Sequence, residues 1–301
     1  MLPELENYPI EKLNTAFLSE KKIRLSIARL DKIHPVVSGN KAYKLLYFIK
    51  EAKEKNYSTI ITFGGAYSNH IVSTAFYCKE AGIKSVGIIR GEKPEKLSHT
   101  LLNCIEYGME LRFIARFDYA HTSAENLCNQ LGLDVNNSMI IPEGGYHSTG
   151  AKGAGKIMNE LFCYQPTHIC TAVGTATTLA GLFANKNDNQ EIIGIPVLKG
   201  MKDIQERMNH LIGEVNESLP TIWNEYHFGG YARSTPALIN FMNDFYTNYN
   251  IPTDFVYTGK MMYGVMDKIQ NNFFPEGSNI ICLHTGGLQG NKSLPTGLLI
   301  F

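Results

Sequence analysis

The segment Thr59-Ile60-Ile61-Thr62-Phe63-Gly64-Gly65-Ala66-Tyr67-Ser68-Asn69-His70 runs from an apolar stretch into a glycine-rich loop. Its first five residues are mostly β-branched or aromatic and are followed by two glycines, a pattern that predicts a short buried strand and a sharp turn. The preceding segment, 44–55, has apolar residues at helical spacing. Helix, strand and glycine loop in this order are the components of a βα unit.

The same unit recurs along the chain. Residues 72–81 are predicted to be helical, and apolar runs at 85–89, 110–114, 168–173, 191–197 and 279–284 are predicted to be strands. Strands that alternate with helices are typical of parallel sheets covered by helices on both faces. The sequence therefore predicts an α/β fold.

Composition narrows the class of protein. The 301 residues are 44% hydrophobic and 19% charged, which is enough for one large or two medium domains, and we expect two. Lys and Arg number 28 and Asp and Glu also number 28, so no net charge is available to attract nucleic acid or an anionic membrane. We expect a small-molecule partner instead.

The sequence also predicts the cellular location and the metal content. The sequence shows neither a signal-peptide pattern nor about 18 successive apolar residues, so we expect a cytoplasmic protein without a membrane span. Six scattered cysteines form no CxxC pair and are read as free thiols. No metal site is expected.

Four glycine-containing loops follow predicted strands, at 64–70, 144–145, 174–178 and 284–290. Ligands in open α/β sheets bind beyond the carboxyl ends of the strands, so these loops are candidates for a site. For each loop alone, the alternative is that the glycines only turn the chain.

The loop Gly174-Thr175-Ala176-Thr177-Thr178 is the strongest phosphate candidate. Small residues let the backbone approach an anion, a helix start offers free amides, and the threonines add hydroxyl donors. The segment is neither a Walker loop nor a dinucleotide-binding GxGxxG motif. The phosphate monoester of a cofactor fits it better.

Lys41 ends the motif Ser38-Gly39-Asn40-Lys41. A desolvated lysine beside a phosphate-bearing cofactor can lose its proton and attack an aldehyde, whereas a lysine without such surroundings is ordinary surface charge. Lys44, one turn later, is read as a surface residue. Lys41 with the neighbouring glycine loops predicts a pyridoxal-phosphate enzyme.

These motifs, with His284-Thr285-Gly286-Gly287, resemble the fold type II pyridoxal-phosphate enzymes of the 1-aminocyclopropane-1-carboxylate deaminase and D-cysteine desulfhydrase group. The resemblance extends from about residue 17 to 290 in the same order. It implies a homodimer whose subunits have two open, largely parallel sheets with the cofactor in the cleft between domains. Residues 1–47 with 153–301 would form the large domain, and 48–152 the small domain carrying Ser68.

The resemblance also assigns roles to residues. Lys41 matches the cofactor-linking lysine, and Ser68 the proposed nucleophile or proton-transfer group. Tyr257 matches an active-site tyrosine, and Tyr231 a second one on a weaker local pattern. The remaining cofactor contacts would be Asn69 at the ring's phenolic oxygen, the phosphate residues Gly174, Thr175, Ala176, Thr177 and Thr178, and Thr258 and Thr285 near the ring. The substrate would meet Ser68, Asn69 and His70.

Thr258 bears on the reaction. Deaminases of this group resemble Tyr-Glu-Gly at this point, whereas desulfhydrases resemble the Tyr-Thr-Gly found here. A hydroxyl leaves the ring nitrogen closer to neutral than a carboxylate does, so the electron sink is weaker and β-elimination is favoured over cyclopropane opening. We therefore expect D-cysteine to give pyruvate, ammonia and sulfide.

Other activities stay open. One alternative is a 1-aminocyclopropane-1-carboxylate deaminase that gives 2-oxobutanoate and ammonia. Others are a racemase, dehydratase or desulfhydrase acting on another amino acid in the same fold. A non-enzymatic alternative is a cofactor-binding amino-acid sensor, although such a sensor would not need Lys41, Ser68 and Tyr257 together.

Overall fold

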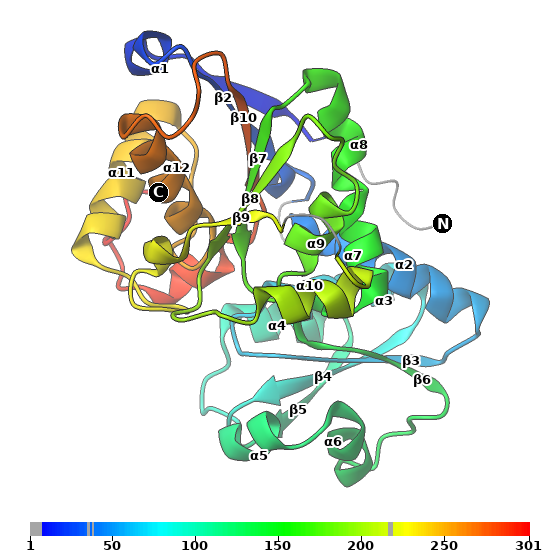
Figure 1. The fold of residues 1–301 in the computed structure, drawn as a ribbon. Coiled ribbons are helices and arrows are strands. Elements are labelled where there is room, and N and C mark those ends of the chain that lie inside the picture. The colour runs from blue at the N-terminus through cyan, green and yellow to red at the C-terminus, as the bar shows by residue number, and fades with distance from the viewer. Residues whose placement is uncertain (1–7, 35–36, 38, 216–218) are drawn as a thin grey trace.

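The computed structural model describes residues 8–34, 37, 39–215 and 219–301. Ser38 of the lysine motif lies outside them. Two sheets form the framework (Figure 1). The larger has the strand order β1 (Ile10–Leu13), β2 (Arg24–Arg29), β10 (Asn279–His284), β7 (His168–Val173), β8 (Glu191–Pro196) and β9 (Thr221–Ile222). The smaller has the order β5 (Met109–Ile114), β4 (Lys84–Arg90), β3 (Thr59–Gly64) and β6 (Ser138–Ile141).

All pairings in both sheets are parallel except that between β1 and β2. The predicted α/β class with largely parallel sheets is thus confirmed. Every predicted strand is present within a residue or two of its predicted bounds. Strands β1, β2 and β9 were not predicted. β1 and β9 are short edge strands, and the apolar residues of β2 are interrupted by Ser26 and bounded by Arg24 and Arg29, so none of the three shows a long apolar run.

The helices connect and cover these strands. The α-helices are α1 (Ala16–Glu20), α2 (Asn40–Glu54), α3 (Asn69–Ala81), α4 (His99–Glu106), α5 (Arg116–His121), α6 (Ala124–Gln130), α7 (Ser148–Gly155), α8 (Ile157–Leu161), α9 (Thr177–Phe183), α10 (Ile204–Ile212), α11 (Pro236–Tyr249) and α12 (Thr258–Gln270). Short 3-10 helices are η1 (Leu30–Lys32), η2 (Glu143–Gly145), η3 (Phe162–Tyr164), η4 (Asn224–His227) and η5 (Leu288–Ser293).

Two helices begin earlier than predicted. The helix expected at 44–55 begins at Asn40, and that expected at 72–81 begins at Asn69. The second start is set by Ser68, whose Oγ accepts a hydrogen bond of 3.3 Å from the amide of Ile71. Consequently Lys41 and Asn69 both lie in the first turn of a helix.

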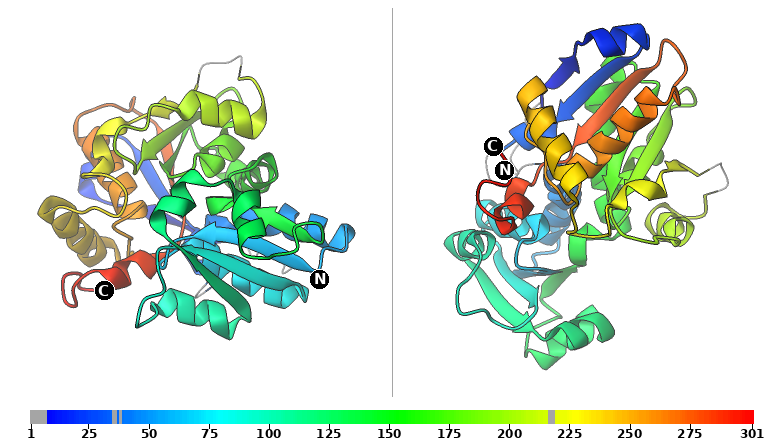
Figure 2. Two further views of the ribbon diagram at one scale, coloured as in Figure 1. Left: turned by 90° about the horizontal axis from the view of Figure 1, so that it is seen from below. Right: turned by 90° about the vertical axis from the view of Figure 1, so that its left-hand side faces the viewer.

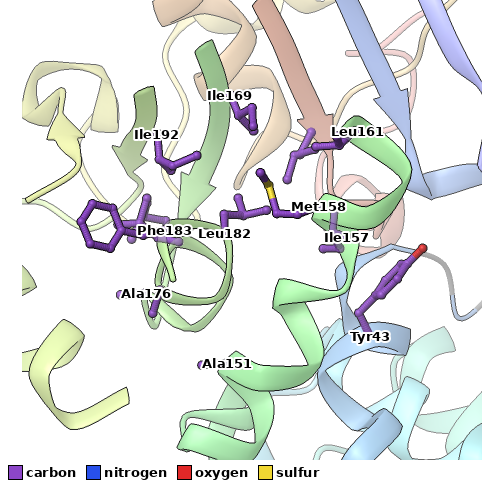
Figure 3. Close-up of a cluster of buried hydrophobic side chains, with 14 of the residues drawn as sticks. Tyr43, Ala151, Ile157, Met158, Leu161, Ile169, Ala176, Leu182, Phe183 and Ile192 are labelled. Atoms are coloured by element: carbon purple, nitrogen blue, oxygen red, sulfur yellow. The ribbon is translucent and has the colours of Figure 1, made fainter. Parts of the chain in front are cut away.

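Helices lie on both faces of the larger sheet (Figure 2). On one face, Met261 and Met262 of α12 pack in one apolar cluster with Ile27 and Ile193. On the other face, α8, α9 and α10 form a second cluster with Ile169 and the strands around it. Figure 3 shows part of this second cluster, in which Tyr43 of α2 lies near Ile157.

Helices α2, α7 and α9 pack at backbone distance. A β-carbon at Gly153 of α7 would lie 2.1 Å from the carbonyl oxygen of Tyr43, and one at Gly181 of α9 would lie 2.4 Å from that of Ala151. Only glycine allows such contacts. The close packing holds α2, which carries Lys41, against α9, which begins at the threonine loop.

The sheets divide the chain much as the predicted domains do, since β3 to β6 form the smaller sheet. Helix α2 spans the predicted boundary at 47/48. Its residues Leu45 and Phe48 share an apolar cluster with Ile60 of the smaller sheet, whereas Tyr43 belongs to the cluster of the larger one. The domain borders therefore stay a prediction.

Two further properties concern the described residues only. None of their helices combines the length and the apolar character needed to cross a membrane. They also contain no group of three or more His, Cys, Asp or Glu side chains that could hold a metal ion.

Candidate active site

A pocket lies at the carboxyl edges of both sheets. Its lining brings together segments that are distant in sequence: Asn40, Lys41, Lys44, Asn69, Gly144, the 172–179 segment, Tyr257, Thr285 and Gly286. Most of the predicted site residues are therefore assembled in one place. The exceptions are Ser68, His70, Tyr231 and Thr258, which do not line this pocket.

Lys41 lies in the first turn of α2. Its Nζ donates a hydrogen bond of 2.7 Å to Oδ1 of Asn40 and lies 5.9 Å from the centre of the Tyr257 ring. Burial lowers the pKa of Lys41 to about 8, and the carboxylate of Asp254 only partly opposes this shift. At pH 7 about a tenth of Lys41 would be neutral, against less than about one part in a thousand for an ordinary lysine.

Asn40 connects Lys41 to the threonine loop, because its Nδ2 donates to Oγ1 of Thr178 at 2.8 Å. In that loop the hydroxyls of Thr175 and Thr177 are 2.8 Å apart. Ala176 adopts a left-handed φ of 68°, which turns the chain from β7 into α9. The loop thus presents hydroxyls and helix-start amides to the pocket, as a phosphate group requires.

Lys44 is buried and lines the pocket, so its prediction as a surface residue was wrong. Its Nζ donates to the carbonyl oxygen of Gly144 at 3.1 Å. The reason is helix geometry: residues three apart share a helix face, so Lys44 faces the same pocket as Lys41. Burial and the nearby Lys41 hold the pKa of Lys44 well below its ordinary value.

No described residue that lines the pocket is acidic. A buried amine such as Lys44 is charged only when a counter-charge is near. The pocket provides none from its own side chains, so an anionic ligand group is the partner that suits Lys44 and the threonine loop.

Ser68 and Asn69 lie where β3 leads into α3. A β-carbon at Gly64 would lie 2.8 Å from the Ser68 hydroxyl, so glycine is needed there for the serine to pack against the strand end. Nδ2 of Asn69 donates to the carbonyl oxygen of Gly287 at 3.2 Å, and its Oδ1 is buried without a partner among the described residues. An unpartnered buried oxygen suits a ligand-binding role for Asn69.

His70 lies behind the pocket, with 2% of its surface exposed. Its Nε2 is 2.9 Å from the Thr62 hydroxyl, which donates its own proton to the carbonyl of Ile141. Nε2 is therefore the donor and Nδ1 an acceptor, which has no partner among the described residues. Burial, followed by the nearby Lys41 and Lys44, lowers the pKa of His70 to about 3, so the ring is neutral.

Asp254 organises the turn that carries Tyr257 and was not predicted. Its fully buried carboxylate accepts hydrogen bonds from the amides of Val256, Tyr257 and Thr258 and from the Thr258 hydroxyl, at 2.6 to 3.0 Å. Asp side chains commonly accept hydrogen bonds from amides two to four residues later in a turn, and this local signal could have revealed Asp254. Because the Thr258 proton goes to Asp254, that hydroxyl is committed to the turn.

Tyr231 lies beside Tyr257, although the two are 26 residues apart in the printed sequence. Their rings meet edge to face with centres 6.0 Å apart. Tyr231 is 46% exposed, and burial of its phenol raises its pKa. The structure thus brings the two predicted tyrosines together, with Tyr257 inside the pocket and Tyr231 outside its lining.

The sequence pattern of the family described as "Pyridoxal-phosphate dependent enzyme" matches residues 3–286. The chain belongs to that family.

Individual relatives of this pyridoxal-phosphate enzyme support the same family assignment. A Thermotoga maritima protein provisionally named 1-aminocyclopropane-1-carboxylate deaminase is 30% identical over 295 residues, covering 91% of this chain and 92% of its own. A mitochondrial Arabidopsis thaliana protein, named as a bifunctional D-cysteine desulfhydrase/1-aminocyclopropane-1-carboxylate deaminase, is 27% identical and covers 84% of this chain and 70% of its own. The crystal structure of a 1-aminocyclopropane-1-carboxylate deaminase homologue superimposes with a TM-score of 0.80 at 28% identity, covering 96% of this chain and 92% of that one.

The pocket of this pyridoxal-phosphate enzyme fits its cofactor. The aldehyde needs an amine of lowered pKa, which Lys41 supplies. The phosphate needs amides, hydroxyls and a cation, which the loop at 174–178 and Lys44 supply. The unpartnered Oδ1 of Asn69 and the adjoining Thr285 remain for the ring.

Proposed function

We propose that the enzyme removes sulfide from D-cysteine by β-elimination, giving pyruvate and ammonia. The observation that carries this proposal is the pocket lining, which combines Lys41 with a phosphate loop and includes no acidic side chain among the described residues. Thr258, at the position of the deaminases' glutamate, is committed to Asp254. Without a carboxylate facing its nitrogen, the pyridine ring of the cofactor would withdraw electrons only weakly. Weak withdrawal is sufficient for β-elimination of a good leaving group.

In this mechanism the bound cofactor supplies an electron sink for charge that develops at the substrate α-carbon. Lys41, which would hold the cofactor in the resting enzyme, would accept the α-proton of the bound amino acid on Nζ, a role that its lowered pKa suits. Ser68 and Asn69, at the start of α3, bind the substrate, with Ser68 also proposed to take part in proton transfer. His70 stabilises the start of α3 through its hydrogen bond to Thr62 of β3.

Tyr257 and Tyr231 would contact the substrate on the side opposite to Ser68 and Asn69. Tyr257 lies against Lys41 and so can orient the amine. A phenol with a raised pKa is protonated at neutral pH and can donate to the leaving group. Movement of the smaller domain would bring Ser68 over the substrate and exclude water.

We further propose that the enzyme is a cytoplasmic homodimer.

A second candidate reaction is the opening of 1-aminocyclopropane-1-carboxylate to 2-oxobutanoate and ammonia. The names of the Thermotoga and Arabidopsis relatives favour it. The same pocket would hold this substrate, and the difference lies in how strongly the ring withdraws electrons.

The test is release of sulfide and pyruvate from D-cysteine by the cofactor-loaded enzyme. Lys41→Ala should abolish release, whereas Lys50→Ala, an exposed lysine of the same helix paired with Glu54, should leave it unchanged. If wild-type enzyme with intact lysine-bound cofactor releases no sulfide, the D-cysteine assignment is wrong. Formation of 2-oxobutanoate from 1-aminocyclopropane-1-carboxylate would then establish the second reaction.

A further inference from the structure

The loop that carries Tyr231, residues 227–233, has an unusual backbone. Phe228, Gly229, Gly230 and Ala232 all have positive φ, at 49°, 92°, 118° and 52°. Two of these residues have side chains, for which the left-handed region is unfavourable. Such a conformation persists only where surrounding structure enforces it.

Lys260 of α12 helps to hold the loop in this conformation. Its side chain is completely buried, and its Nζ donates to the carbonyl oxygens of His227 at 2.9 Å and Gly230 at 2.7 Å. These carbonyls lie on either side of the two glycines with positive φ. One ammonium therefore ties the two ends of the strained turn together, immediately before Tyr231.

The backbone hydrogen bonds within the loop are local. The amides of Gly230 and Arg233 donate to the carbonyls of His227 and Gly230, at 3.0 and 3.1 Å. The amide of Gly229 donates to Nδ1 of His227 at 3.0 Å. These bonds shape the turn but do not tie it to α12. The ring of Phe228 packs edge to face on Tyr263 of α12, with centres 4.9 Å apart, and the bonds from Lys260 are the hydrogen bonds that hold the loop backbone to that helix.

Lys260 also shares a helix face with Tyr257, which lies three residues earlier and forms the N-terminal cap of α12. The start of one helix thus holds Tyr257 against Lys41 and anchors the loop of Tyr231. We propose that Lys260 is a positioning residue, which fixes the Tyr231 phenol beside Tyr257 by binding the carbonyls of His227 and Gly230. The catalytic part of this inference rests on the proposed role of Tyr231.

A buried lysine can also be retained only for stability of the core. The two explanations differ in where the effect of a substitution appears. A positioning role predicts a change confined to residues 227–233, and it predicts that the effect on activity passes through Tyr231. A purely structural role predicts a loss spread over α12 and the core around it.

The first experiment is hydrogen–deuterium exchange of the cofactor-loaded enzyme. Lys260→Met, which keeps the volume but removes the donors, should speed amide exchange in 228–233 by about tenfold while exchange in β7 and β10 is unchanged. Lys268→Met is the matched control, since this lysine of the same helix contacts Glu225, Trp223, Tyr226 and Phe273 but not the loop. It should leave exchange in 228–233 unchanged.

If Lys260→Met does not accumulate as folded protein, Lys260→Gln, which keeps an N–H donor without the charge, replaces it. Faster exchange confined to the loop supports the proposal. Unchanged loop exchange, or faster exchange throughout α12, overturns it. This measurement does not depend on the substrate, so it stays decisive even if the enzyme releases no sulfide from D-cysteine.

The second experiment is a double-mutant cycle on kcat/KM with Tyr231→Phe. If Lys260 acts through Tyr231, adding Lys260→Met to Tyr231→Phe changes kcat/KM by less than about twofold, because interacting residues are not additive. If the two losses multiply, Lys260 does not act through Tyr231. If no substrate is turned over by wild-type enzyme, the proposed function fails and exchange alone decides on Lys260.

Discussion

Asn69 at the start of α3 and Gly287 in the loop after β10 are in contact. Nδ2 of Asn69 donates to the carbonyl oxygen of Gly287 at 3.2 Å, and a β-carbon on Gly287 would lie 2.1 Å from that nitrogen. The side chain that starts α3 of the smaller sheet is thus seated on the loop that follows β10 of the larger one. Glycine at 287 is a requirement of this contact between two parts of the site.

Gly287→Ala should therefore displace Asn69 and weaken cofactor binding. The φ of Gly287 is +81°, and a left-handed conformation alone costs an alanine about 1–2 kcal/mol. Gly277→Ala is the control, because Gly277 has a similar φ of +84° but open space around its β-position. We expect both variants to lower Tm, and only Gly287→Ala to raise the Kd for pyridoxal phosphate in an absorbance titration. Equal cofactor affinity in the two variants would contradict the role of the Asn69 contact.

Capture of the cofactor by Lys41 should depend on pH. The neutral amine is the nucleophile, and it predominates above its pKa of about 8. The capture rate of apoprotein should rise with pH up to about 8 and then level off. Stopped-flow absorbance after mixing with pyridoxal phosphate measures this rate. A rate that continues to climb toward pH 10 would show that burial does not lower the pKa of Lys41.

Lys44→Met tests the buried amine at the phosphate end of the pocket. Because no acidic side chain lines the pocket in the part of the chain that the structure describes, loss of Lys44 should leave the Tm of the apoprotein unchanged or raised. Cofactor affinity should fall about tenfold or more, since hydrogen bonds to charged groups contribute about 1.5–3 kcal/mol. Lys50→Met, at an exposed site, should change neither quantity. Unaltered cofactor affinity in Lys44→Met would remove Lys44 from the phosphate site.

Thr258→Val tests the turn organised by Asp254. Valine keeps the shape but removes the hydroxyl, leaving the Asp254 carboxylate short of one donor and the Asp254 amide without its acceptor. An unsatisfied buried polar group costs about 1–3 kcal/mol, so the free energy of unfolding should fall by at least that amount. Denaturant titration provides the measurement. A loss no larger than that of Thr247→Val, whose exposed hydroxyl donates to the carbonyl oxygen of Asn243 in α11, would contradict this account.

Ala176→Gly should be a stabilising change. Ala176 has a φ of 68°, and glycine adopts this conformation without the steric conflict of a β-carbon. After glycine's larger loss of backbone freedom is allowed for, we expect a gain of up to about 1 kcal/mol. Calorimetry should show a higher Tm for Ala176→Gly and a lower one for Ala180→Gly, which lies inside helix α9. A lower Tm in both variants would show that position 176 carries no strain.

The sequence by itself was sufficient to predict the parallel strands and the family. Apolar runs that end in glycine mark buried strands locally, and the order of the motifs along the chain marks the family. The structure agrees because each signal depends on a few neighbouring residues. The roles of the individual site residues and the domain borders, by contrast, remain predictions.

Tertiary structure alone decided the contacts between these local signals. Asn40 meets Thr178 across 138 residues, and Asn69 meets Gly287 across 218. The burial of Lys44 and the bonds of Lys260 to the Tyr231 loop also depend on which helices pack together. The sequence does not show whether a lysine side chain is solvated or packed against carbonyl groups, because its burial depends on the packing of the folded chain. The identity of the site residues is thus local information, whereas their electrostatics and positions are properties of the assembled fold.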